Sequence, residues 1–309
     1  MTAWGVVQSL RASSPGLRLV TADTNPRELV AASADADAFE RVPAAADPAF
    51  AAAFAAATAR HRVDTWIPVH DVEIVVAAEA RANGTLPAGI VTTAPEAAAA
   101  RLCWDKLAVA EALAAAGIGS PATLRGDAAG AWRGPCMVKP RNGVGSHGAR
   151  LLDGPHLRTP EEASDAFVLQ ELCDAPEVTI DAFRAARDGW FAAACRERID
   201  VRAGIATRCR VFPDAELEQL ALRVAEAVGL TGVFCLQAMR SRTHDRWLVT
   251  DVNPRPGGAT RMSVAAGMDF HAAMVADAWG EDARRFLPGL TRERWVARGY
   301  VERVLEPGA

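Results

Sequence analysis

A glycine-rich loop between two short apolar runs is the feature of this sequence that most limits its fold. The stretch GPCMVKPRNGVGSHGARLLDG (residues 134–154) places Gly143, Gly145 and Gly148 in a G-x-G-x-x-G spacing. A dinucleotide-binding fingerprint requires a helix after that loop. Here the segment ARLL, closed by an Asp-Gly turn pair, has the pattern of a short strand. The spacing therefore predicts a flap between two antiparallel strands, whose backbone amides close over phosphates as the glycine-rich loop of kinases does.

Lysine is almost absent from the chain. Only Lys106 and Lys139 are lysine among the 34 basic residues, so 32 are arginine. The abundance of alanine and arginine is typical of a G- and C-rich coding bias, which would replace surface lysines by arginine. A compact ammonium on a flexible stem reaches a phosphate where a planar guanidinium does not fit. We therefore expect both lysines to contact phosphate, with retention by chance as the alternative.

A polar cluster ends the apolar run in WLVTDVNPRPGGATRM (residues 247–262). Asp251 and Asn253 are two apart on a predicted strand, so their side chains share one face. Two such oxygen ligands suit magnesium, which takes its remaining ligands from water and substrate phosphates. If GVFCLQAM and RWLVTDVN pair as a hairpin, Gln237 faces Asp251 and helps to complete the shell. Arg255 then stands one step beyond the metal, where it would stabilise a transferring phosphoryl group. A simple turn after the strand is the alternative interpretation.

Composition excludes several classes of protein. The net charge of −4 and the pI near 5.9 argue against a nucleic-acid partner. No uncharged apolar run approaches the roughly 18 residues that span a bilayer, and the N-terminus lacks a signal-peptide pattern. We expect no membrane partner and a cytoplasmic location. The six cysteines form no C-x-x-C pair, which suits reduced, buried thiols.

The first hundred residues have the pattern of an α/β unit. Leu17–Asp23 and Val63–Val69 read as strands, with Ala-rich helical segments between them. This alternation predicts a parallel, doubly wound sheet with ligands beyond the carboxyl ends of its strands. Asp23, Asp71 and Glu73 occupy such ends, either as caps of the next helices or as substrate contacts. The opening TAWGVVQSLRASSPG predicts a helix with no strand before it, so a late start or a shortened sheet is expected.

The segment AFVLQELCDAPEVTIDAF (residues 166–183) predicts a strand, a short polar link and a second strand. In the link, Gln170, Glu171 and Leu172 could offer backbone donor and acceptor groups to an adenine edge. Glu177, at the start of the second strand, could accept hydrogen bonds from ribose hydroxyls.

Four segments in order resemble the ATP-grasp superfamily, in particular the branch of the carbamoyl-phosphate synthase large subunit. They are WDKLAVAEALAAAGI, VKPRNGVGSHG, VLQELCDAPEVTID and VTDVNPRPGG. The resemblance implies a Rossmann-like preceding domain over residues 1–98, linker helices and a small lid over 99–168, and a larger carboxyl domain over 169–309. It runs from the N-terminus to about Phe270, and ATP would lie between the last two domains.

The resemblance also implies roles for individual residues. ATP would be contacted by Lys106, Lys139, Gly143, Gly145, Ser146, Gly148, Gln170, Glu171, Leu172 and Glu177. The metal ligands would be Gln237, Asp251 and Asn253, and the catalytic residues Arg255, Arg202 and Lys139. Asp251 stands where the family usually has a glutamate, which leaves one metal ion or two open. Arg202 lies in ERIDVRAGIATR, a stretch similar to one near the family's substrate side, with an exposed strand arginine as the alternative.

We therefore expect an ATP- and magnesium-dependent, ADP-forming ligase, with manganese as a substitute metal. It would activate a small carboxylate as an acyl phosphate for attack by an amine. Carbamoyl-phosphate-like activation of bicarbonate and a non-catalytic ATP-binding module are the alternatives. The identity of both substrates stays open, as does the oligomeric state, a homodimer included.

Overall fold

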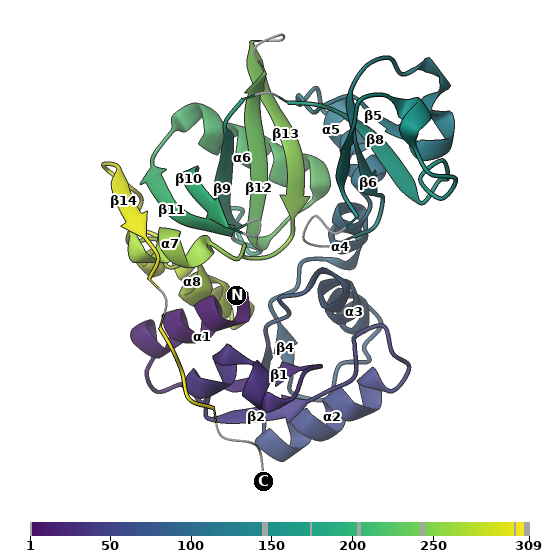
Figure 1. Cartoon of the computed structure of the whole chain (residues 1–309). Helices are drawn as coiled ribbons and strands as arrows, with labels where there is room; N and C mark the ends of the chain where they lie inside the picture. Colours follow the sequence, from purple (N-terminus) through teal and green to yellow (C-terminus); the bar gives the residue numbers. More distant parts are fainter. Residues whose placement is uncertain are drawn as a thin grey trace.

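A computed structural model of the chain describes residues 2–143, 148–173, 175–202, 205–241, 245–299 and 301–305. Its helices and strands gather into an N-terminal region, a small lid region and a larger C-terminal region (Figure 1). Of the predicted site residues, Gly145 and Ser146 lie outside the described residues.

The N-terminal region carries short parallel strands between helices. In order it contains α1 (Thr2–Ser13), β1 (Val20–Asp23), η1 (Arg27–Leu29), η2 (Ala31–Asp35), β2 (Ala38–Arg41), α2 (Phe50–His61), β3 (Thr65–Trp66), α3 (Asp71–Ala82) and β4 (Val91–Thr92). β1 pairs with β2 and β3 with β4, both in parallel. The parallel pairing agrees with the predicted α/β class, but the described strands form two separate pairs and not one continuous sheet. Phe50, Trp66 and Ile74 are buried between α2, β3 and α3.

The helix α1 is formed as predicted and packs both on η2 of its own region and on the C-terminal region. It contacts α7 (Thr260–Ala265) and α8 (Phe270–Ala278) of the C-terminal region (Figure 1). A Cβ on Gly5 would lie 3.3 Å from the Cβ of Arg261, so glycine allows this close approach. The buried His271 ring lies 2.8 Å from the Ser9 hydroxyl across the same contact. The first helix of the chain thus joins the N-terminal region to the C-terminal core.

The lid region is a four-stranded antiparallel sheet preceded by two helices. It contains α4 (Ala97–Trp104), α5 (Lys106–Ala115), β5 (Thr123–Arg125), η3 (Gly126–Ala131), β6 (Cys136–Pro140), β7 (Arg150–Leu152), η4 (Pro155–Leu157) and β8 (Phe167–Glu171), with sheet order β5-β8-β6-β7. Asp105 separates the two helices because its carboxylate caps α5, accepting from the backbone N–H groups of Leu107 and Ala108. β6 and β7 pair on either side of the glycine-rich loop, as the sequence predicts.

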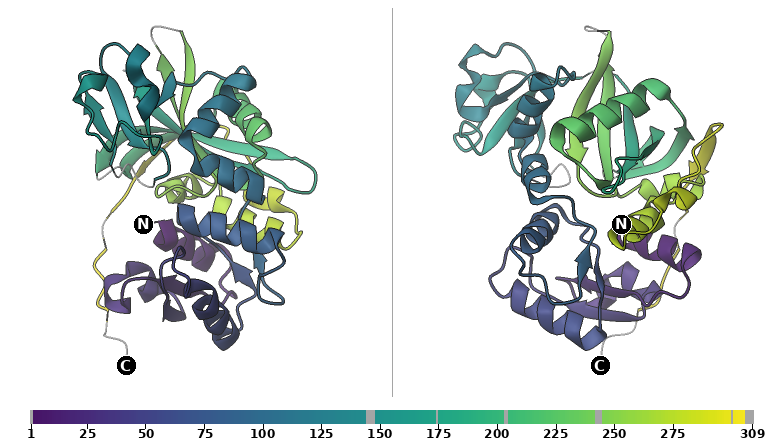
Figure 2. Two further views of the ribbon diagram at one scale, coloured as in Figure 1. Left: turned by 90° about the vertical axis from the view of Figure 1, so that its right-hand side faces the viewer. Right: turned by 180° about the vertical axis from the view of Figure 1, so that it is seen from behind.

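The C-terminal region is built on a six-stranded antiparallel sheet. It contains β9 (Glu177–Arg184), β10 (Phe191–Arg202), β11 (Ile205–Phe212), α6 (Ala215–Val228), β12 (Gly232–Ser241), β13 (Arg246–Asn253), α7, α8, η5 (Ala283–Phe286) and β14 (Arg294–Ala297), in sheet order β13-β12-β9-β10-β11-β14. One face packs on α6 through residues such as Ile180 and Leu217. The other packs on α1, α7 and α8 through residues such as Phe183 and Phe270 (Figure 2). Both faces are covered, which explains the unbroken burial of β9 from Val178 to Phe183.

Some features were not predicted from the sequence. β2, β4, β14 and the β10–β11 hairpin are additions, since their short or charged segments lack clear alternation. β8 pairs with β5 and β6 of the lid sheet along its whole length, so this strand crosses the predicted boundary at residue 168, and the domain bounds stay a prediction. No helix in the described part of the chain is long and apolar enough to cross a membrane.

Candidate active site

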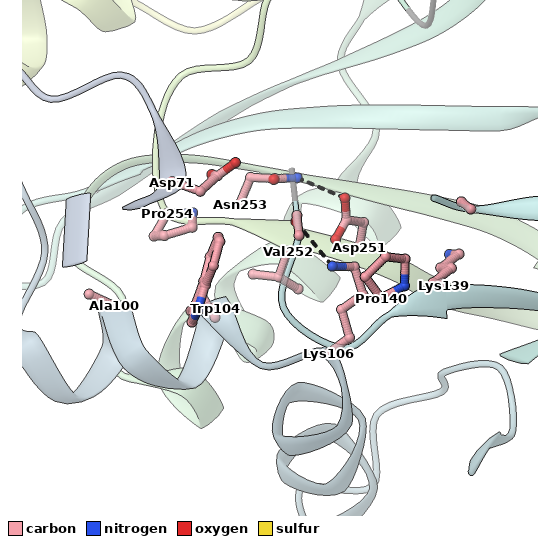
Figure 3. A pocket seen from close by; sticks show the side chains of 13 residues that line it. Asp71, Ala100, Trp104, Lys106, Lys139, Pro140, Asp251, Val252, Asn253 and Pro254 are labelled. Carbon is pink, nitrogen blue, oxygen red and sulfur yellow. Dashed lines mark hydrogen bonds between the residues drawn. The ribbon is translucent and has the colours of Figure 1, made fainter. Parts of the chain in front are cut away.

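One pocket brings together most of the predicted phosphate and metal residues. It is lined by Asp71, Ala100, Cys103, Trp104, Lys106, Lys139, Pro140, Gly143, Ala149, Asp251, Val252, Asn253 and Pro254. These residues come from α3, α4, α5, the two sides of the flap and β13, so all three regions contribute. Asp251 and Asn253 lie in the middle of the pocket, between Asp71 at one end and the two lysines at the other (Figure 3).

The two lysines enter the pocket from different elements. Lys106 is the first residue of α5, and its Nζ donates to the backbone carbonyl of Gly143, 3.1 Å away. Lys139, on β6, donates from Nζ to Oε1 of Gln170 at 2.6 Å. Burial lowers the pKa of Lys139 below its usual 10.5, and Lys106 adds to this lowering, while the charge of Asp251 opposes it. Two cations therefore lie near one carboxylate, where an anionic ligand would be attracted.

The flap that joins β6 and β7 is described only at its two ends. Gly143 lines the pocket, and Gly148 has a left-handed backbone with φ of 72°. A Cβ on Gly148 would lie 2.9 Å from Cγ of Pro140, so both conformation and space favour glycine there.

The predicted metal ligands lie together on the β12–β13 hairpin. Gln237 is directly opposite Asp251 in the strand register, as the sequence predicts. The side-chain amide of Asn253 donates to Oδ2 of Asp251 at 3.1 Å and to Oε1 of Gln237 at 3.4 Å. Among the described residues, no three His, Cys, Asp or Glu side chains gather as a metal cluster. A metal at this place would depend on one carboxylate and two amide oxygens, and such an all-oxygen set fits magnesium.

Arg255 forms an ion pair with Asp71 of the N-terminal region. Its Nε lies 2.6 Å from Oδ1 and its Nη2 lies 2.9 Å from Oδ2 of that carboxylate. Both side chains are largely covered, with 16% and 13% of their surface exposed. The backbone N–H of Arg255 donates to the carbonyl of Asn253 at 2.8 Å, so this arginine directly follows β13, called the metal strand below because it carries the predicted ligands Asp251 and Asn253. The sequence left the role of Asp71 open, and the structure gives it a charged partner 184 residues away.

The residues predicted for adenine and ribose have partners of their own. Glu171 donates its backbone N–H to the carbonyl of Ala122 and accepts from the N–H of Ala122 through its side chain. Leu172 is 36% exposed next to it. Glu177 forms an ion pair with Arg198 of β10. Gln170 is buried and its Oε1 accepts from Lys139, so its side chain lies beside that lysine.

Arg202 lies apart from the pocket lining. It is exposed at the end of β10, where it is paired in register with Ile205 of β11. Its predicted role on the substrate side stays a prediction.

Two groups of residues at the site were not predicted from the sequence. Trp104 and Cys103 line the pocket, and their position two and three residues before Lys106 was the available signal. Below the loop that follows Asn253, Asp181 accepts hydrogen bonds from Arg196, Thr260 and Ser263 at 2.6–3.2 Å. The Asp181–Arg196 pair is almost fully buried.

The buried network around Asp181 holds the loop that follows β13 in place. Burial alone would raise the pKa of Asp181, but Arg196 and the two hydroxyl groups hold it below its usual range. The backbone N–H of Gly257 donates to the same Thr260 hydroxyl at 2.8 Å. The network therefore connects the sheet to the loop after the metal strand.

Comparison with known proteins decides the family. Residues 103–259, half of the chain, match the sequence profile described as the ATP-grasp domain. The chain belongs to the ATP-grasp family. None of the curated proteins compared with it matches this ATP-grasp chain in sequence.

Solved structures with the same fold include several larger proteins. Pyruvate carboxylase of Rhizobium etli aligns with a TM-score of 0.72 and 18% identity over 91% of this chain and 28% of its own. A second structure is the biotin carboxylase domain of Hydrogenobacter thermophilus 2-oxoglutarate carboxylase, in complex with MgADP, ADP and bicarbonate. It aligns with a TM-score of 0.70 and 14% identity over 91% of this chain and 68% of its own. L-amino acid ligase of Bacillus licheniformis aligns with a TM-score of 0.66 and 13% identity over 88% of this chain and 70% of its own. At these identities the similarities establish the ATP-grasp fold of this chain.

Proposed function

We propose that this ATP-grasp protein is an ADP-forming ligase that activates a small carboxylate as an acyl phosphate and passes the acyl group to an amine. The observation that carries the proposal is the pocket in which Lys106, Lys139, Asp251 and Asn253 meet. Phosphoryl transfer depends on positioning and charge stabilisation and needs no covalent enzyme intermediate. The two lysines would supply charge stabilisation, and all four residues would position the phosphates and the metal.

The nucleotide would lie with its phosphates at the lysines and under the flap. A smaller hollow adjoins the pocket and shares Cys103, Lys106, Asp251 and Val252 with it. Its wall includes Val109 and Leu113, and a partly apolar wall suits an adenine ring. The backbone at Glu171 and Leu172 is proposed to meet the adenine edge, and Glu177 the ribose.

Gln237, Asp251 and Asn253 are the proposed ligands of one Mg²⁺, or of Mn²⁺ in its place. When bound, the ion would neutralise negative charge on the phosphates of ATP. The set contains one carboxylate, so a second divalent cation would depend on the phosphate oxygens of ATP for its anionic ligands.

The acceptor would enter from the Asp71 end of the pocket, because the attacking and leaving oxygens of a phosphoryl transfer lie roughly in line. A carboxylate oxygen attacks the terminal phosphorus, the bond to the bridging oxygen breaks, and ADP leaves. The amine nitrogen then attacks the acyl carbon, the carbon–oxygen bond to phosphate breaks, and the amine proton is released. Arg255 and Lys139 would stabilise charge on the transferring group, with Arg202 proposed on the substrate side.

Bicarbonate activation is the second candidate. It is favoured by the similarity to biotin carboxylase domains, one of which was solved with MgADP and bicarbonate. Both candidates predict ADP as the product, so the acceptor must be found by experiment.

A screen of amino acids, small carboxylates and bicarbonate, each with and without an amine, would separate these candidates. ADP release that requires a carboxylate and an amine supports the ligase. ADP release with bicarbonate alone favours the second candidate. ATP binding without ADP release under any condition would leave a non-catalytic module.

The active acid, labelled with ¹⁸O in its carboxylate, then tests the mechanism. An acyl phosphate must lose one acid oxygen to phosphate when the amine displaces it. We expect ¹⁸O in inorganic phosphate with ADP as coproduct, measured by mass spectrometry. An adenylate route would place the label in AMP and release pyrophosphate. Label in AMP, or in neither product, would reject the acyl-phosphate mechanism.

A further inference from the structure

Asp71 lies at a fixed point of the N-terminal region. It is the first residue of α3, at the end of the loop that follows β3. Glu73 holds this loop, accepting from Nε1 of Trp66 at 2.9 Å and from the backbone N–H of Val69 at 3.3 Å. Trp66 is buried in the core of the region. The Asp71 carboxylate is therefore presented by a tethered loop.

The contact of Asp71 with Arg255 fixes the orientation of the guanidinium and also balances its charge. Nε and Nη2 face the two carboxylate oxygens, and Nη1 donates to the carbonyl of Pro256 at 3.3 Å. Such a fork of two parallel hydrogen bonds fixes the plane of an arginine. A guanidinium has five N–H groups, so two remain for another ligand. Asp71 lines the pocket and Arg255 follows the metal strand, which places this fork beside Asn253.

We propose that Asp71 is a positioning residue for the proposed phosphoryl transfer, acting through Arg255. It holds the free N–H groups of the guanidinium toward the transferring group, and the N-terminal region is thereby part of the catalytic machinery. This inference rests on the proposed function. Its rival is a direct contact of Asp71 with the substrate, because a carboxylate in the pocket could also bind a cationic acceptor.

A double-mutant cycle separates the two roles. We would compare Asp71→Asn, Arg255→Met and the double variant with the wild type. The assay measures ADP formation from Mg·ATP. The acid is the carboxylate that gives ADP release in the screen, and hydroxylamine is the amine. Asp71→Asn keeps shape and removes charge. A misplaced catalytic group costs about 100-fold, so we expect kcat to fall by about 10- to 100-fold while KM for ATP stays within about twofold. In the Arg255→Met background, Asp71→Asn should change kcat by less than about twofold.

Control variants guard against a purely structural effect. Asp37 forms a more exposed ion pair with Arg11 in the same region, 2.6 Å apart, and Asp37→Asn should leave kcat unchanged. Asp71→Glu, which keeps the charge, should retain more activity than Asp71→Asn. It also serves as the test variant if Asp71→Asn does not fold. Thermal melting and calorimetric binding of Mg·ATP would be measured for each variant.

The failures of the two ideas differ. Normal kcat in Asp71→Asn, or losses that multiply in the double variant, would overturn the positioning role. An Arg255→Met variant with unchanged kcat would also overturn the positioning role, whereas a wild type that forms no ADP with any acid of the screen would overturn the proposed function.

Discussion

Replacement of Lys139 by methionine tests the phosphate end of the pocket directly. The Lys139 ammonium has three donors, and Gln170 takes one of them. A single charge-assisted hydrogen bond to a phosphate contributes about 1.5–3 kcal/mol. At 1.4 kcal/mol per decade, Lys139→Met should weaken Mg·ATP binding by about 10- to 150-fold. Isothermal titration calorimetry measures this change.

Arg133→Met is the matched control. Arg133 is an exposed cation of the same lid region and does not line the pocket, so its loss should leave the Kd for Mg·ATP unchanged. If Lys139→Met and this control bind Mg·ATP with the same Kd, Lys139 is no phosphate ligand.

The lowered pKa of Lys139 adds a pH dependence to the same measurement. Burial disfavours the ammonium form, so the free protein loses this proton below the usual lysine value of 10.5. The ammonium form binds phosphate, hence affinity for ATP should be full at pH values below the lowered pKa and should fall as pH rises through it. Lys139→Arg, which stays charged, should lack this alkaline loss, although its different geometry should weaken binding at neutral pH. An identical alkaline loss in both proteins would contradict this assignment.

Two further variants test the metal strand and its support. Asp251→Asn removes charge and keeps shape, so ADP release should be lost while the melting temperature and ATP binding through the adenine persist. Near-normal rates across a magnesium titration would mean that the metal site lies elsewhere. Asp181→Ala would leave Arg196 buried without its partner and should lower the free energy of unfolding by about 3–5 kcal/mol in urea titrations. Asp188→Ala, at an exposed ion pair, should leave the urea midpoint unchanged, and equal midpoints for the two variants would remove the stabilising role of the buried pair.

Local patterns predicted much of the candidate site. The alternation of side chains along a strand put Asp251 and Asn253 on one face, and a short polar turn predicted the hairpin that places Gln237 opposite Asp251. The rarity of lysine drew attention to Lys106 and Lys139, and both line the pocket. The structure agrees with these placements because each depends on residues that are close in sequence or on a single strand pairing, while the phosphate and metal roles stay predictions.

Contacts between distant segments were not predictable in the same way. Nothing near Asp71 in sequence indicates that it meets Arg255, since that contact depends on how two regions pack. The ion pair of Glu177 with Arg198 needs the β9–β10 pairing, and β10 carries too many charges for its alternation to be recognised. The short strands β3 and β4 depend on tertiary packing, because two residues carry no periodicity.

The long separation between Asp71 and Arg255 has a consequence for the order in which the protein is made. A ribosome adds about 5–20 residues per second, so about 10–40 s pass between the synthesis of the carboxylate and that of its guanidinium, 184 residues later. The interval is longer still between the synthesis of α1 and that of α7 and α8, against which it packs. During this interval the N-terminal region must stay accessible to segments that have not yet emerged. The candidate pocket is thus completed only after β13 has been synthesised, and a chain interrupted before this strand would carry Lys106 and Lys139 without Asp251 and Asn253.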